Sequence, residues 1–187
     1  NLKIFKSLVD EIKNSQNEII NSPNIKKIQK NISEDKKRER IACDFQDKNF
    51  EELDYICEKV SELFYGRKLI PTKSLYIDKC FDVPEAKIRG DNYLHIDRFL
   101  PNLKILFSPY SITNDDAPFV YSLNSHKINT NYINFLLNTK NFDETDSNAE
   151  NFKKNKLTVT VKENSAIIAV TNGFHGRTSF KKNSERI

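Results

Sequence analysis

A histidine and an aspartate stand two residues apart in the segment "NYLHIDRFL", residues 92–100. In a β-strand the side chains alternate between the two faces, so His95 and Asp97 would lie side by side on one face. An imidazole and a carboxylate in that arrangement can supply two adjacent ligands to a metal ion. A hydrogen-bonded pair on a solvated strand face is the alternative, because His-x-Asp often occurs by chance. The pair alone does not decide between the two interpretations.

A third ligand is available further along the chain. Besides His95 the sequence contains two histidines, His126 and His175. His175 follows the apolar run "AIIAVTNGF" and begins a second short segment with strand character. Strands that are distant in sequence become neighbours in a β-sandwich or jelly roll, so His175 can return to the face of His95 and Asp97. Two histidines and one carboxylate on one side of a metal form the ligand set of non-haem Fe(II) oxygenases.

The hydrophobic pattern predicts the elements that must position these residues. Residues 1–67 are expected to be mainly helical, with the best amphipathic helix in residues 49–66. From residue 68 to 187, short segments rich in β-branched and aromatic residues alternate with turn signals. This order predicts a single domain that is mainly β with flanking helices, in which an N-terminal helical buttress packs on a double-stranded β-helix, or jelly-roll, core.

Residues 138–156, "NTKNFDETDSNAENFKKNK", are rich in Asn and charged residues and poor in large apolar ones. Such a composition cannot bury much apolar surface. We therefore expect an exposed polar loop here, flexible and placed at the mouth of a pocket.

Composition and charge argue against several classes of partner. The chain has 187 residues and a formal net charge of +4, with acidic and basic residues interleaved. Nucleic-acid binders concentrate Lys and Arg on one face, so no nucleic-acid partner is expected. No apolar run approaches the roughly 18 residues of a membrane span, so no membrane partner is expected. Three cysteines without a CxxC spacing favour neither disulfides nor a zinc site, and they predict a reducing, cytoplasmic setting.

The order and spacing of these residues resemble the phytanoyl-CoA dioxygenase-like family of Fe(II)- and 2-oxoglutarate-dependent oxygenases. The family pattern is His-x-Asp, a distal His and an Arg about eleven residues beyond it, and the matching residues are His95, Asp97, His175 and Arg186. The segments "PNLKILFSPYSITNDDAPFVYSLNSHK", residues 101–127, and "HGRTS" resemble the family as well. Two departures stand out. Asn124 replaces the Gly of a Gly-Ser-His segment, and the chain ends just after Arg186, where the family continues through another strand.

The resemblance implies an oxidoreductase, a dioxygenase that hydroxylates a small-molecule substrate with molecular oxygen. It implies Fe(II) held by His95, Asp97 and His175, and 2-oxoglutarate held by a bidentate contact from Arg186. Arg177 would share the face of His175 in a regular strand, and it is expected either to bind 2-oxoglutarate or an acidic substrate, or to be a surface charge on an edge strand. Thr178 and Lys104 are weaker candidates for contact with 2-oxoglutarate.

Two alternatives stay open. One is a cupin-like metal-binding protein that uses the same three ligands without 2-oxoglutarate, against which Arg186 argues. The other is a non-catalytic jelly-roll interaction module, which the missing Gly leaves possible. His126, in the "NSHK" turn, is expected to shape the pocket and not to bind the metal.

Overall fold

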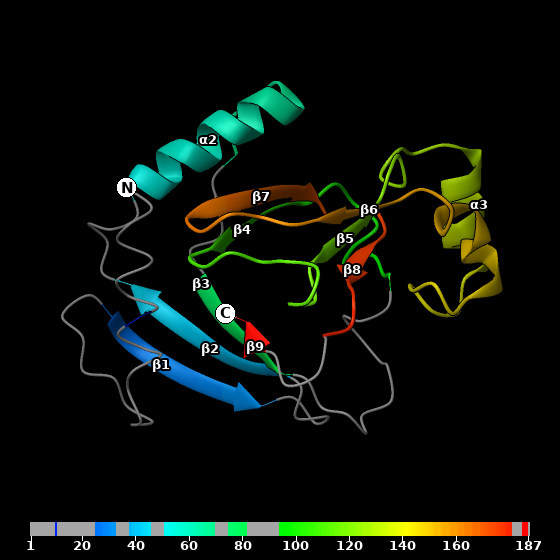
Figure 1. Ribbon diagram of the computed structural model, residues 1–187. Coiled ribbons are helices and arrows are strands. Elements are labelled where there is room, and N and C mark those ends of the chain that lie inside the picture. The colour runs from blue at the N-terminus through cyan, green and yellow to red at the C-terminus, as the bar shows by residue number, and fades with distance from the viewer. Residues whose placement is uncertain are drawn as a thin grey trace. The chain divides into compact units, whose positions relative to one another are not determined.

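The computed structural model describes residue 10 and residues 25–32, 38–45, 51–69, 75–81, 94–180 and 185–186 (Figure 1). By their internal contacts the residues form two compact units, residues 1–81 together with residue 187, and residues 82–186.

The first unit contains an antiparallel sheet and a helix. Strand β2 (Arg38–Phe45) pairs with β1 (Ile25–Ile32) on one side and with β3 (Leu75–Phe81) on the other. Helix α2 (Glu51–Tyr65) lies between β2 and β3 in sequence and confirms the helix predicted for residues 49–66. Gly66 ends it with a φ of 65°, in the left-handed region that favours glycine.

Strands β1 and β2 differ from the helical expectation for residues 1–67. The isoleucines of β1 recur every three or four residues, which is a helical spacing. The strand nevertheless pairs with β2 in a continuous antiparallel register from Lys27↔Asp44 to Ile32↔Glu39. The helical expectation is therefore wrong for this segment, because pairing between neighbouring strands outweighs local periodicity.

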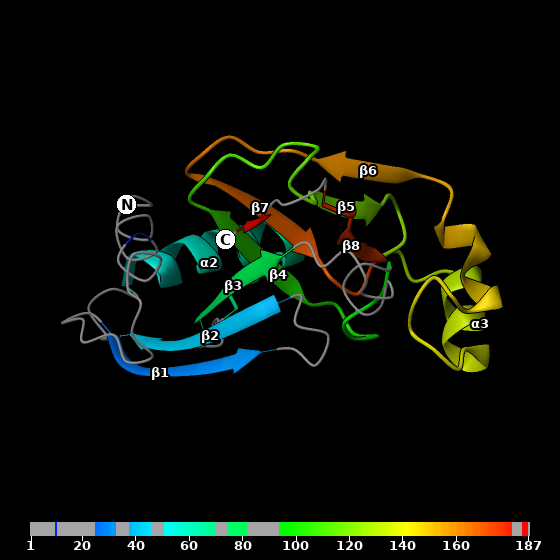
Figure 2. The same ribbon diagram turned by 60° about the horizontal axis from the view of Figure 1, so that its bottom comes forward.

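The second unit is built from short strands and two small helices. Its elements are, in chain order, β4 (Leu103–Ser108), β5 (Phe119–Ser122), α3 (Thr130–Asn138), the 3₁₀ helix η3 (Ser147–Phe152), β6 (Lys156–Val159), β7 (Ser165–Val170), β8 (His175–Arg177) and β9 (Glu185–Arg186). Strand β4 pairs with β7, and β5 lies between β6 and β8, all antiparallel. In Figure 2, α3 lies to the right of β6 and β8. The predicted mainly β character is confirmed. None of the described helices is long and apolar enough to cross a membrane.

The core of the second unit forms where α3 and η3 meet the strands. The ring of Phe135 lies 5.7 Å from that of Phe152 and 5.1 Å from that of Phe174, and the rings of Phe152 and Phe174 stack at 4.8 Å. Leu94 and Ile96 join this cluster and are 3% and 5% exposed. The alternation expected for the segment around His95 is thus confirmed, since Leu94 and Ile96 enter the core and His95 and Asp97 lie on the opposite face.

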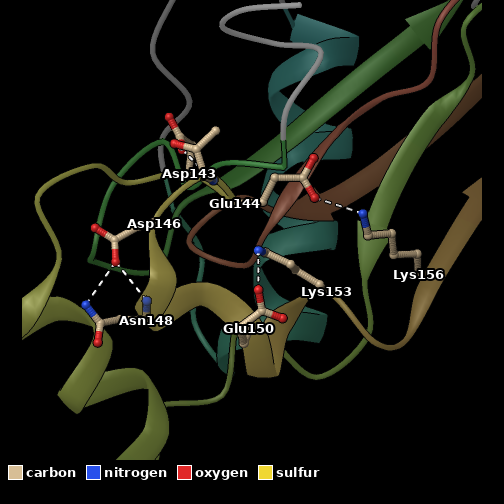
Figure 3. Close-up of polar contacts among 8 residues, drawn as sticks. Asp143, Glu144, Asp146, Asn148, Glu150, Lys153 and Lys156 are labelled. Carbon is tan, nitrogen blue, oxygen red and sulfur yellow. Dashed lines mark hydrogen bonds and ion pairs between the residues drawn. The ribbon is translucent and has the colours of Figure 1, made fainter.

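The exposed loop expected for residues 138–156 is wrong for its middle part. Ala149 and Phe152 are buried, at 0% and 6% exposed, because a spacing of three in a 3₁₀ helix places both on one side. Asp146 caps η3 by accepting a hydrogen bond from the N–H of Asn148 at 2.9 Å (Figure 3). Hydrogen bonds from the N–H groups of Asn148 and Lys140 also hold the pKa of Asp146 well below its usual value. Two buried apolar residues and one helix cap therefore order a segment whose average composition is polar.

Candidate metal centre

Backbone pairing brings the segment around residue 95 next to strand β8. The N–H of His95 donates to the carbonyl of His175 at 2.8 Å, and the N–H of His175 donates back to His95 at 2.9 Å. Directly opposite residues of an antiparallel pair share a face, and the two imidazole centroids lie 4.7 Å apart. On its other side His95 forms an isolated bridge to Asp143. Although the strand predicted for residues 92–100 is reduced to these bridges, the backbone of His95 is fixed from both sides.

Asp97 completes a cluster of three donor side chains. Its Oδ2 lies 3.3 Å from Nε2 of His175, and its Oδ1 lies 3.8 Å from Nε2 of His95. One donor atom from each residue lies within 4.8 Å of the other two. Metal–ligand bonds of about 2.1 Å place adjacent ligands about 3 Å apart, so a small contraction would bring all three onto one ion.

A hydrogen bond to the chain orients the imidazole of His175. Its Nδ1 lies 2.9 Å from the carbonyl oxygen of Gly173. A carbonyl only accepts, so Nδ1 carries the proton of this bond and Nε2 is the nitrogen that faces Asp97. Histidines that bind metals are commonly held by such a bond, which fixes both the tautomer and the ring orientation. The side chain of His175 is 7% exposed, so little solvent competes for this position.

The turn that aims His175 has no room for a side chain at Gly173. A Cβ there would lie 2.1 Å from Oη of Tyr121 and 2.9 Å from Oγ of Ser125. Both groups are already bonded, since Tyr121 Oη donates to the carbonyl of Val170 at 2.8 Å and Ser125 Oγ accepts from the N–H of Phe174 at 2.7 Å. Sequence reasoning missed this role. The signal was the Asn172-Gly173 pair, whose glycine lies two residues before His175.

The charge of Asp97 is stabilised by two neighbours. Burial of its carboxyl raises the pKa, but hydrogen bonds from His175 and Lys104 and their positive charges outweigh that effect and hold the pKa of Asp97 well below its usual value. The carboxyl is therefore ionised at neutral pH, as a metal ligand must be. Lys104, a candidate contact of 2-oxoglutarate, forms a 2.5 Å ion pair with Oδ2 of Asp97, and its contact with the cofactor stays a prediction.

The other candidate cofactor contacts lie in β8, directly after it, and in β9. Arg177 lies two residues beyond His175 in β8, with its side chain buried at 9% exposed. Thr178 follows the strand, where its N–H donates to Pro118 at 3.1 Å and its buried Oγ1 has no hydrogen-bond partner. Arg186 lies in β9, but its side chain is outside the part of the chain that the structure describes. Its proposed role stays a prediction.

The "NSHK" turn lies beside the centre and adds no donor to it. Asn124 adopts a φ of 65°. This is the left-handed conformation that Gly enters freely and that Asn tolerates better than most residues, so its replacement of Gly preserves the turn. The ring of His126 lies 6.4 Å from that of Tyr121, and its buried Nδ1 has no hydrogen-bond partner. Burial lowers the pKa of His126.

Comparisons of the chain with protein family models, with curated proteins and with solved structures find no match. The functional interpretation therefore depends on the geometry of the site and on the motif order in the sequence.

Proposed function

We propose that this chain is an Fe(II)- and 2-oxoglutarate-dependent oxygenase that hydroxylates a small-molecule substrate. The observation that carries the proposal is the convergence of His95, Asp97 and His175 on one face, each with a donor atom within 4.8 Å of the others. Two imidazoles and one carboxylate, with no thiolate, suit Fe(II) in an open site. The His-x-Asp order and the distal histidine support the same interpretation.

A jelly-roll core belongs to the proposal. Strand β8 lies between β5 and the backbone of residue 95, which in turn bridges to residue 143. Segments remote in sequence are therefore neighbours around the histidines, as the jelly-roll arrangement requires.

The residues present fit an iron ion and an anionic organic cofactor. The donor set is nitrogen and carboxylate oxygen, and the buried guanidinium of Arg177 has N–H groups without acceptors. When bound, Fe(II) and 2-oxoglutarate would supply the oxidising chemistry that inserts oxygen into a C–H bond.

The chain's own residues prepare the site. Gly173 holds the proton of His175 on Nδ1, which leaves Nε2 for the metal. Lys104 bonds to Oδ2 of Asp97, which directs a metal ion to the other carboxylate oxygen and leaves more coordination positions open. Phe119 is 8% exposed and its ring lies 5.8 Å from that of His175, so it limits the access of water.

Metal titration and product analysis test the proposal. The metal-free protein should bind one Mn(II), read by electron paramagnetic resonance, and His175→Ala should lose most of this affinity. His126→Ala is the matched control and should keep it. Unchanged Mn(II) binding in a folded His175→Ala variant would contradict the metal assignment.

Succinate production separates the alternatives. With Fe(II), oxygen and 2-oxoglutarate, the wild type should form succinate, and the Ala variants of the three ligands should not. Metal binding without succinate would indicate a cupin-like metal protein. Absence of both activities would indicate an interaction module.

A further inference from the structure

The second unit buries two nitrogens of one guanidinium group without giving them an acceptor. Arg177 is 9% exposed, and its side-chain Nε and Nη1 have no hydrogen-bond partner. Arginine cannot lose its proton in a protein, so the charge is permanent. Leaving a buried charge and its donors unpaired is strongly unfavourable. A partner that the chain does not supply from its described residues would remove this cost.

Arg177 shares a strand face with the candidate metal centre. Residues two apart in a strand point the same way, so Arg177 and His175 lie on one face with their Cα atoms about 6.6 Å apart. The register of β5 and β8 places Phe119 opposite Arg177 and Tyr121 opposite His175. The two aromatic rings therefore belong to the same face, and the apolar surroundings strengthen any charge–charge contact made there.

Stacking does not explain the buried charge. The guanidinium carbon of Arg177 lies 5.5 Å from the centroid of the Phe180 ring, within range of a cation–π contact. An aromatic face offers no acceptor in the plane of the guanidinium, so the N–H groups stay unsatisfied. The contact can hold the plane of the group while its donors remain available. A planar fork of donors is the arrangement that binds a carboxylate through two hydrogen bonds.

We propose that Arg177 binds the carboxylate of an organic anion beside the metal. The inference rests on the proposed function and deepens it, because the resemblance gives this role to Arg186. The carboxylate has two possible sources. It is either the distal carboxylate of 2-oxoglutarate, which we favour because of the position next to His175, or a carboxylate of the substrate.

Two 2-oxo acids of equal chain length test the first source. Calorimetric titration of the Mn(II)-loaded protein compares 2-oxoglutarate with 2-oxopentanoate, which lacks the distal carboxylate. The wild type should prefer 2-oxoglutarate. Arg177→Met keeps the bulk of the side chain and removes its charge, and this preference should fall by about 10- to 100-fold with the affinity for 2-oxopentanoate unchanged. Arg186→Met tests the competing assignment that the resemblance implies, and under this inference it should keep the preference.

A second titration tests the other source. Glutarate, a dicarboxylate without the 2-oxo group, is added to protein saturated with Mn(II) and 2-oxoglutarate. If the preference for 2-oxoglutarate survives in Arg177→Met but glutarate binding is lost, Arg177 binds a substrate carboxylate. If Arg177→Met changes neither the preference for 2-oxoglutarate over 2-oxopentanoate nor the binding of glutarate, the inference is overturned. It is also overturned if Arg186→Met loses this preference and Arg177→Met keeps it.

Control measurements separate this inference from the proposed function. Mn(II) affinity is measured first on every variant. A wild type that binds no Mn(II) contradicts the proposed function, whereas normal Mn(II) binding with carboxylate binding independent of Arg177 contradicts only this inference. Should Arg177→Met fail to fold, Arg177→Lys keeps the charge and removes the fork, and an intermediate loss of preference is expected.

Discussion

Replacing Gly173 with Ala should weaken metal binding even though residue 173 is not a ligand. The added Cβ would lie 2.1 Å from Oη and 2.8 Å from Cζ of Tyr121, so the ring has to move. Overpacking of this kind costs about 1–3 kcal/mol. If Tyr121 also loses its 2.8 Å hydrogen bond to the carbonyl of Val170, about 1 kcal/mol is added. The free energy of unfolding of the metal-free protein should fall by about 2–4 kcal/mol.

The effect on the metal follows from the carbonyl of the same residue. Gly173 O accepts the hydrogen bond that orients His175, at 2.9 Å from Nδ1. Loss of such a partner typically lowers metal affinity by about 10- to 100-fold. Urea unfolding in the presence of a chelator measures the stability of Gly173→Ala, and Mn(II) titration measures its affinity.

Gly66→Ala is the matched control. Gly66 has a φ of 65° and nothing within 4 Å of an added Cβ, so only backbone strain of about 1 kcal/mol is expected. Its Mn(II) affinity should equal that of the wild type. If Gly173→Ala retained both wild-type stability and wild-type Mn(II) affinity, the close approach of Tyr121 and the orienting role of the carbonyl would both be refuted.

Three further predictions concern single side chains. Lys104→Met removes a cation that bonds to Oδ2 of Asp97 and repels a metal ion, so Mn(II) should bind more tightly; weaker binding would mean that Lys104 chiefly orients the carboxylate. The pKa of Asp97 is lower in the folded state than in the unfolded state, so its charge stabilises the metal-free fold. This stabilisation is complete above about pH 4, the pKa of an unperturbed Asp, and it is lost as the pH falls from there through the folded-state pKa. The stability deficit of Asp97→Asn in urea unfolding should therefore shrink as the pH falls below about 4. Phe152→Ala should lower the free energy of unfolding by about 3–5 kcal/mol, since the buried ring stacks on Phe174 at 4.8 Å, whereas the half-exposed Phe142 should tolerate Ala with a much smaller loss.

The face shared by His95 and Asp97 could be predicted from the sequence because strand alternation is a local property. Leu94 and Ile96 enter the core, so the polar pair must lie on the opposite face. The arrival of His175 on that face depends on sheet topology, for which the sequence offered only the family's motif order. The structure brings the three donors together, and their role as ligands stays a prediction.

The contacts that sequence reasoning missed are tertiary ones. The ion pair of Lys104 with Asp97 joins β4 to a segment that precedes it, and alternation within β4 could not reveal the partner. The burial of Phe152 was hidden by the polar average of residues 138–156, in which a single aromatic anchor carries little weight. In the same way, the expectation that residues 1–67 are mainly helical contained no information about the pairing of residues 25–32 with β2.

The backbone hydrogen bonds that join residues 95 and 175 also have a kinetic meaning. The two histidines are 80 residues apart in the sequence. Closing a flexible loop of that length costs about 4 kcal/mol of chain entropy, and contacts at such separation form late in folding. Before closure the chain offers a metal only one imidazole and one carboxylate at this place. Binding of Mn(II) during refolding should therefore be slower than the formation of local structure. Its rate would report the rate at which the segments around residues 95 and 175 pair.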